Sequence, residues 1–539
     1  MPRININEVD NTIYSTNQLT NDNIVYVPGY TPTGEYRNPV LLTTTNDFES
    51  QFGDYPLEGY PTYNYVRGLL VAGLPVLFRR IVGRNMDADD STRIQILTKS
   101  ANGTFLAAES GANLFKVEEK WGGSFGNNLT AAIVKSSDSY YFRVYYNGKI
   151  KEEKFIAQKA ADADEDQTTV FNNACYNFFK NTEFDTVNVT IDSAMDEDPT
   201  GFAIQEQTIV LTGGADPAYP EEEVENAGKD PIKDEIPNTY DFIKDKYLYD
   251  VKFVTAGGYT DSDVSDTLIS SAQVKLCETR KDCFAILDIP FGTRMADVTK
   301  FFTAHDTSYA AAYAPWCYTK LPTGDKEWMA PSYLFLYTLG RSIKDGNMVY
   351  DAPAGVLKAS MPQVIKPEYE IGGDVLNSWT SANPQSINPI MKLQSYGYVI
   401  YGQNTLYNIQ NKASSKKSAL QKINVRLAIN EVRRLLFNAG IRMTFQANTI
   451  RTWNEFKAIV EPELSIMKAN NGIHDYRVKM DNTTTTDEDI QNNTIRAQVS
   501  ISVTKAVEDF EIDFYIEPQS VTFADEENSK NVLLGSLYV

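Results

Sequence analysis

The fold is indicated most clearly by the run Cys283-Phe284-Ala285-Ile286-Leu287-Asp288, which is apolar until it ends in a carboxylate. Such continuous apolar runs are typical of strands that a parallel sheet buries on both faces. Helical spacing is present before it, from Ile269 to Cys277, and after it, from Met295 to Phe302. The next strand is predicted from Tyr309 to Tyr313, so residues 247–400 are expected to be α/β.

The same alternation of strand and helix begins near the start of the chain. Ile24 to Val27 and Val76 to Ile81 are predicted strands, and Tyr63 to Val71 is a predicted helix between them. We expect residues 26–85 and 247–400 to form one split α/β domain.

The residues between these two halves have a different pattern. Tyr140 to Tyr146 alternates in polarity and is followed by Asn147-Gly148, the strongest short-range signal for a hairpin. Residues 86–215 are therefore predicted to be an inserted, mainly β domain. Residues 216–246 are dense in Asp, Glu, Lys and Pro, which favours a solvated acidic linker.

Residues 401–504 are predicted to be a C-terminal α+β domain. Apolar residues from Leu420 to Leu436 have helical spacing, with Gly440 as the expected stop. Thr452-Trp453-Asn454-Glu455 has a capping-box pattern that predicts the start of a second helix. Residues 495–503 alternate in polarity and predict a strand.

Both ends of the chain, residues 1–25 and 505–539, are expected to be extended arms. They are polar, with short apolar alternations, and too thin to fold alone. The apolar residues in these short stretches include Ile4, Ile6, Val9, Ile512, Phe514, Ile516, Val532, Leu533 and Leu534.

Composition excludes several functions. The 539 residues include 50 Lys+Arg and 71 Asp+Glu, which gives a net charge of −21 and argues against nucleic acid and anionic membranes. The longest apolar run, residues 69–78, is too short to span a bilayer, and no secretory signal is expected.

The chain offers little for catalysis. It has two histidines and four cysteines without CxxC spacing, so no metal or other cofactor is expected. Asp288 at a strand end and His305 beside Asp306 are the positions an enzyme would use, and a hydrolase relying on His305 is a remote alternative. No GxSxG sequence supports it, and a strand-end Asp is more simply a turn former. We expect no enzymatic activity.

One segment runs against the overall charge. Residues 412–442 carry eight basic residues and one acid, Glu431, for a local net charge of +7. It is either a solvated helix face or a docking face for an acidic partner.

Stretches along nearly the whole chain resemble the contractile tail sheath proteins. Those nearest the start are Val25-Tyr26-Val27-Pro28-Gly29, Asp47-Phe48-Glu49-Ser50-Gln51-Phe52-Gly53 and Trp121-Gly122-Gly123-Ser124-Phe125-Gly126-Asn127-Asn128-Leu129. Later ones are Arg280-Lys281-Asp282-Cys283, Ala352-Pro353-Ala354-Gly355, Asn404-Thr405-Leu406 and Asn471-Gly472-Ile473. Asn404 stands where the family's pattern has an arginine.

The resemblance implies a sheath subunit that polymerises helically around a tail tube and contracts to drive the tube through the host cell envelope. It implies a subtilisin-like central domain without protease activity, a C-terminal domain facing the tube, and arms that add strands to neighbours. Adding a strand to another subunit's sheet would satisfy the backbone groups of the arms, and the nine apolar arm residues named above are the candidate positions for it. The implied partners are further copies in stacked hexameric rings, the tube protein, and baseplate and tail terminator proteins. The implied location is the virion tail, assembled in the bacterial cytoplasm. The candidate tube contacts are then Lys416, Lys417, Lys422, Arg426, Arg433 and Arg434.

Two related alternatives remain. The sheath of a tailocin or of an extracellular contractile injection device would have the same sequence features. A tail tube protein is disfavoured because tube subunits are usually much smaller single domains.

Overall fold

The computed structural model describes residues 23–86, 94–107, 110–160, 163–197, 199–218, 230–261, 268–380, 386–407 and 418–506. Nearly all of the two expected arms lies outside these ranges, as do all nine strand-addition candidates, Lys416 and Lys417. Among the helices described, none combines the length and the apolar character needed to cross a membrane.

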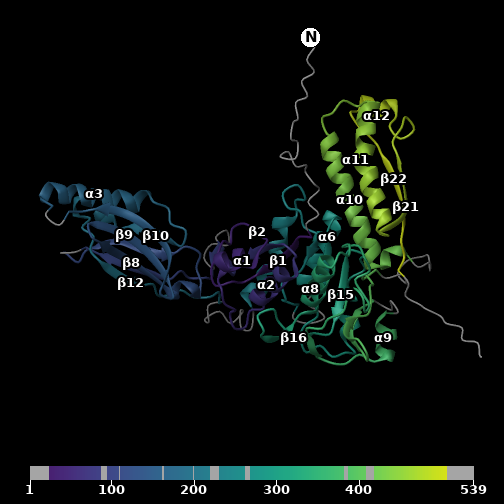
Figure 1. Ribbon diagram of the computed structural model, residues 1–539, viewed down its shortest axis with the longest axis horizontal. Coiled ribbons are helices and arrows are strands. Elements are labelled where there is room, and N and C mark those ends of the chain that lie inside the picture. The colour runs from purple at the N-terminus through teal and green to yellow at the C-terminus, as the bar shows by residue number, and fades with distance from the viewer. Residues whose placement is uncertain are drawn as a thin grey trace, which may run out of the picture. The chain divides into compact units, whose positions relative to one another are not determined.

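An eight-stranded sheet forms the centre of the first α/β region (Figure 1). Its strand order is β2 (Val40–Leu42), β3 (Val76–Arg80), β1 (Val25–Gly29), β13 (Phe253–Val254), β14 (Phe284–Leu287), β15 (Ala310–Ala314), β19 (Asn388–Leu393) and β20 (Gly397–Ile400). The pairs from β3 to β19 are parallel, and β2 and β20 are antiparallel strands at the edges. Because β1 pairs with both β3 and β13, strands from before and after the insertion belong to one sheet.

Helices cover this sheet because its inner strands are apolar on both faces. They are α1 (Thr45–Phe52), α2 (Thr62–Ala72), α5 (Pro231–Thr239), α6 (Leu268–Arg280) and α8 (Pro331–Lys344). α2 packs against α8, where a Cβ at Gly68 would lie 2.2 Å from the Tyr333 hydroxyl oxygen. Glycine is thus required at Gly68 for the close approach of the two helices. α5 packs against α6.

The prediction of a solvated linker over residues 216–246 is wrong for its second half. Residues 231–239 form α5, and Ile232 and Ile236 are fully buried in the central core. The Tyr26 hydroxyl donates a hydrogen bond to the Thr239 carbonyl at 2.9 Å. Asp234, one of the charged residues that suggested a linker, is exposed on this helix, whereas Glu235 is buried together with the apolar residues four apart, Ile232 and Ile236.

The inserted region has its own core and two main sheets. One sheet has the order β10 (Lys149–Gln158), β9 (Ser139–Tyr146), β8 (Leu129–Ser136) and β12 (Gln207–Val210), and the other has the order β11 (Val187–Ile191), β7 (Asn113–Glu119) and β6 (Asn102–Leu106). β4 (Arg84–Met86) and β5 (Ile94–Ile96) form a separate pair. The hairpin predicted at Asn147-Gly148 is confirmed, with φ of 47° and 78° at these two residues, as a type I′ turn requires.

One helix of the insertion was not anticipated from sequence. α3 (Glu165–Asn181) begins with a capping box between Asp164 and Gln167. Its buried residues include Phe171, Cys175 and Phe179, which are four apart, and this spacing was the available signal.

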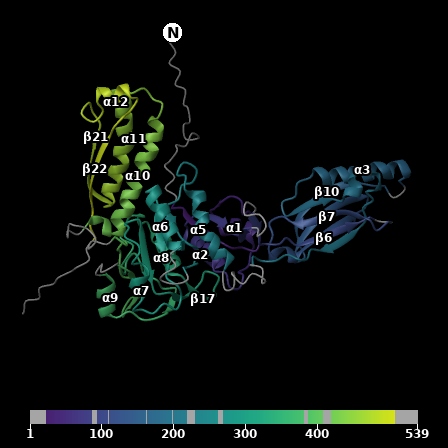
Figure 2. The same cartoon turned by 180° about the vertical axis from the view of Figure 1, so that it is seen from behind.

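The C-terminal region consists of α10 (Ile423–Met443), α11 (Ile450–Ala469), β21 (Ile473–Lys479), α12 (Asp487–Gln491) and β22 (Gln498–Val503). In both views α10 and α11 lie side by side, with β21 and β22 along them (Figures 1 and 2). The expected stop at Gly440 is wrong, because α10 continues to Met443. An interior glycine costs only about 1 kcal/mol, which the burial of Ala439 and Leu435 offsets.

The start of α11 also differs from the prediction. Thr449 is the N-cap, and its hydroxyl accepts a hydrogen bond from the Thr452 backbone N–H. The capping-box pattern at Thr452 therefore lies inside the helix.

The remaining elements are η1 (Ser124–Asn128), α4 (Ser193–Glu197), η2 (Pro199–Gly201), η4 (Tyr240–Ile243), α7 (Val298–Phe301), β16 (Cys317–Lys320), β17 (Lys326–Met329), β18 (Val364–Pro367), α9 (Gly373–Thr380) and η5 (Ala419–Gln421).

Candidate interaction surfaces

Arg80, at the end of β3, connects the central sheet to the inserted region. Its side chain is 1% exposed. It donates hydrogen bonds to four backbone carbonyls: Thr31 at 2.8 Å, Gly34 at 2.9 Å, Trp121 at 2.8 Å and Gly122 at 2.5 Å. Two of these carbonyls belong to the central region and two to the insertion. One buried guanidinium thus joins the two, and burial lowers its pKa.

This contact explains the glycines of the Trp121-Gly122-Gly123 motif. Gly122 and Gly123 have φ of 72° and 126°, and a Cβ at Gly123 would lie 2.3 Å from the Pro32 carbonyl oxygen. The loop directs the Trp121 and Gly122 carbonyl oxygens at Arg80.

A second buried group completes this junction. Glu119 accepts hydrogen bonds from the Thr33 hydroxyl at 2.9 Å and from the Gly122 backbone N–H. Burial raises the pKa of this carboxyl. The chain returns from the insertion at Asp216, which accepts from the Tyr30 hydroxyl at 2.5 Å and the Ser124 N–H at 2.9 Å.

The structure changes the interpretation of the basic segment on α10. Arg426 is 3% exposed, hydrogen-bonds to Ser308, and has its guanidinium carbon 4.2 Å from the centre of the Tyr309 ring. Burial lowers its pKa. Arg426 therefore packs against the central region and does not present its charge on the surface.

Arg434 is also held internally. It donates to the backbone carbonyls of Val251 and of Asp282, the latter at 3.1 Å, and forms an ion pair with Asp250. Burial lowers its pKa to about 10.

Lys422 and Arg433 complete the described part of the basic segment. Lys422 donates to the Asn404 side-chain carbonyl at 2.7 Å. Arg433 is exposed and makes no ion pair within the described part of the chain. Of the four described candidates, Arg433 alone has an exposed side chain.

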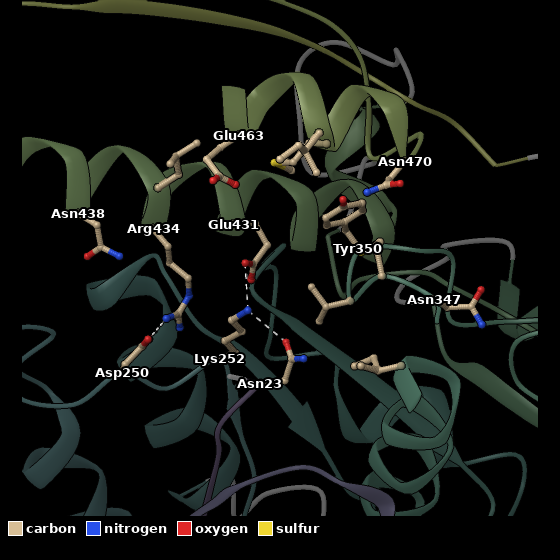
Figure 3. Close-up of a pocket in the computed structure, with 16 residues that line it drawn as sticks. Asn23, Asp250, Lys252, Asn347, Tyr350, Glu431, Arg434, Asn438, Glu463 and Asn470 are labelled. Carbon is tan, nitrogen blue, oxygen red and sulfur yellow. Dashed lines mark hydrogen bonds and ion pairs between the residues drawn. The ribbon is translucent and has the colours of Figure 1, made fainter. Parts of the chain in front are cut away.

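A cleft of about 660 Å³ lies between α10, α11 and the central region (Figure 3). At its centre the Lys252 ammonium, 5% exposed, donates to Glu431 at 3.0 Å and to the Asn23 side-chain carbonyl at 3.1 Å. Beside this group lies the Arg434–Asp250 ion pair. The cleft was not predicted from sequence, because Lys252 at its centre binds Asn23 and Glu431, each more than 170 positions away in the chain.

The two positions considered for catalysis have structural roles. Asp288 accepts from the Ser332 N–H at 2.7 Å and its hydroxyl at 2.5 Å, so it caps the N-terminus of α8. Burial raises the pKa of Asp288 to about 7, although both hydrogen bonds act in the opposite direction. His305 Nε2 lies 3.1 Å from the Ser270 hydroxyl oxygen, and burial lowers its pKa. No cluster of metal-binding side chains occurs among the described residues.

β21 and β22 form a two-stranded sheet. Within the described chain, neither strand pairs with a third strand. Two-stranded sheets are marginally stable by themselves. In general, the edge strand of a sheet carries backbone groups that can pair with a further strand.

The comparisons with known proteins agree with one another. The chain is 22% identical over 484 residues to the tail sheath protein of Vibrio phage KVP40, covering 84% of this chain and 67% of that protein. It is also 22% identical over 299 residues to the tail sheath protein of Enterobacteria phage T4, covering 52% and 44%. No protein-family model matches the chain.

Solved structures of sheath tail proteins have the same fold. The protein from Desulfitobacterium hafniense matches with a TM-score of 0.53 at 12% identity, covering 89% of this chain and 93% of that one. The protein from Listeria innocua matches with a TM-score of 0.55 at 13% identity, covering 89% and 95%. A chain of the anti-feeding prophage baseplate in the contracted state matches with a TM-score of 0.51 at 14% identity, covering 96% and 99%.

Proposed function

We propose that this chain, a relative of phage tail sheath proteins in sequence and fold, is the structural subunit of a contractile tail sheath. It polymerises helically around a tail tube and contracts to drive the tube through the host cell envelope. The observation that carries the proposal is the sequence similarity over 84% of the chain to a tail sheath protein. The fold shared with two sheath tail proteins over 89% of the chain supports it independently.

Electron microscopy of the purified protein tests this function. Negative staining should show tubes, and helical reconstruction should show stacked rings, which we expect to be hexameric. A protein that stays monomeric at high concentration, with and without a co-expressed tube protein, would contradict the proposal. The related alternative is the sheath of a tailocin or extracellular injection device, and the fold shared with the anti-feeding prophage chain suits both.

The central region is proposed to be an inactive, subtilisin-like domain. Its parallel sheet with helices against it supports the fold. The roles of Asp288 as a helix cap and of His305 as a buried partner of Ser270 support the absence of activity. If hydrolysis of a general ester substrate were measured and lost in His305→Ala, the protein would be an enzyme.

The arms are proposed to link subunits by strand addition. The outer edges of β21 and β22 are suitable acceptors, because a neighbour's arm would extend a two-stranded sheet. At about 1 kcal/mol net per hydrogen bond, a short added strand holds subunits together while the bodies move. Deleting residues 1–22 or 507–539 should abolish polymerisation and leave the circular dichroism of the body unchanged. Long tubes formed by either truncated protein would contradict this assignment.

The C-terminal region is proposed to face the tube, with baseplate and terminator proteins at the ends of the sheath in a virion tail assembled in the bacterial cytoplasm. Because Arg426 and Arg434 bind within the chain, the proposed contact is carried by Arg433 together with Lys416 and Lys417, which lie outside the described residues.

A further inference from the structure

The cleft between α10, α11 and the central region begins where the described chain begins. Asn23 is the first described residue, and its side chain is part of the wall. The next residue is fixed as well, because the Ile24 carbonyl accepts from the backbone N–H groups of Lys252 at 2.9 Å and Phe253 at 3.2 Å. Twenty-two residues precede Asn23 in the sequence. The chain therefore enters the described structure through this cleft.

The chemistry of the cleft suits a polar peptide with few charges and one apolar side chain. Its two cations already have carboxylate partners, in the Lys252–Glu431 and Arg434–Asp250 pairs. An acidic segment such as residues 508–517 would place its carboxylates beside these carboxylates, so the charges disfavour it.

The cleft also has apolar and polar surface that an occupant could contact. Ile466 is 53% exposed on its wall, beside Met348 and Met467. The side chains of Asn438 and Glu463 line the cleft and have no hydrogen-bond partner in the described part of the chain. An occupant with one apolar side chain and backbone donors would satisfy both kinds of surface.

The residues directly before Asn23 have these properties. Gln18-Leu19-Thr20-Asn21-Asp22 contains a single apolar residue and a single charge. Four extended residues span about 13–14 Å, and a cavity of this volume is equivalent to a sphere about 11 Å across. The reach of four residues is therefore comparable to the size of the cleft, so Leu19 can lie within it when Asn23 is in its wall.

We propose that residues 18–22 of the same chain occupy this cleft, with Leu19 packed against Met348, Ile466 and Met467. The free part of the arm then ends at residue 17 and not at residue 22. Residues 18–22 are bound by α10, α11 and the central region together. This contact lies within one subunit, so it does not depend on assembly of a sheath.

A disulfide cross-link in the full-length protein tests the proposal. The double variant Leu19→Cys/Ile466→Cys should form an intramolecular disulfide under mild oxidation at low protein concentration, in most of the molecules. The four native cysteines are all buried, and the sulfurs of Cys277 and Cys283 lie 3.3 Å apart, so the unsubstituted protein is run in parallel to measure the background from this pair. Leu19→Cys/Val170→Cys is the matched control, because Val170 is 69% exposed on α3 of the inserted region.

Three outcomes decide the matter. An intramolecular bond at least five times more abundant than in the control supports the proposal. Equal yields in the two variants overturn it. Disulfide-linked dimers without the intramolecular species also overturn it, because the occupant is then a second copy's arm. None of these outcomes depends on whether tubes form.

Hydrogen exchange provides an independent measurement on the wild-type monomer. Amides of residues 18–22 should exchange at least tenfold more slowly than those of residues 5–12, and Leu19→Asp should remove the difference. Equal exchange rates in the two windows of the wild type would contradict the proposal even if both cysteine variants failed to fold.

Discussion

Replacing Arg80 by Met tests whether one guanidinium joins the inserted region to the central sheet. The substitution keeps an unbranched side chain of similar length and removes every donor. Four buried carbonyl oxygens then lose their partner: those of Thr31, Gly34, Trp121 and Gly122.

The expected loss follows from these contacts. Each orphaned buried carbonyl costs about 1–3 kcal/mol, although relaxation and water entry recover part of the sum. Removing one charge of a buried network, here near Glu119, costs about 3–5 kcal/mol. We expect the free energy of unfolding to fall by about 3–5 kcal/mol. With an m-value of about 2 kcal/mol/M, the urea midpoint should shift by about 1.5–2.5 M.

Urea unfolding followed by tryptophan fluorescence and circular dichroism measures this shift. Trp121 lies at the junction itself and is the single tryptophan between residues 86 and 215. Arg143→Met is the matched control, because Arg143 forms a surface ion pair with Glu153 on the insertion and its loss should cost less than about 1 kcal/mol. If the midpoint of Arg80→Met equalled that of the control, the junction would not depend on this side chain.

Three further changes have defined outcomes. Asp288 has its pKa raised to about 7 in the folded state, so the native protein binds this proton more tightly than the unfolded chain, and stability falls as pH rises from about 4 to 7. The urea midpoint of Asp288→Asn minus that of the wild type should therefore rise between about pH 4 and 7 and stay constant above pH 7. A difference that is the same at every pH would refute the assignment. Phe445 is fully exposed with φ of 67°, so Phe445→Gly should stabilise the chain by about 0.5–1 kcal/mol in thermal unfolding, whereas Phe445→Ala should not. Reversing Lys416, Lys417 and Arg433 to Glu should weaken co-sedimentation with tube protein, most at low salt, and undiminished co-sedimentation would remove the tube-facing assignment.

The elements that sequence predicted well are those whose pattern is local. β14 (Phe284–Leu287) forms within the run at residues 283–288, and because a buried parallel strand is covered on both faces, its consecutive side chains are all apolar. The Asn147-Gly148 hairpin depends on two residues that accept positive φ. Neither conclusion needs information from distant parts of the chain.

The errors arose where distant contacts decide the outcome. The charged residues of segment 216–246 suggested a solvated linker, but Ile232 and Ile236 within it pack on the central core. On α10, charge alone suggested one basic face, yet Arg426 and Arg434 bind groups more than 100 residues away. Helical spacing cannot separate a basic side chain that binds solvent from one that binds the protein's own carbonyls.

The position of β1 has a consequence for how the chain is made. β1 pairs with β3 on one side and with β13 on the other, and about 170 residues separate the end of β3 from β13. At a synthesis rate of about 5–20 residues per second, the ribosome needs roughly 10–30 s to supply the missing strand. During that interval the apolar edge of β1 is open to any other nascent strand. The inserted region, with a core of its own, can fold first and hold the chain ends near each other through Arg80. Slowing translation within residues 86–250 should therefore lower the soluble yield more than slowing it after residue 260.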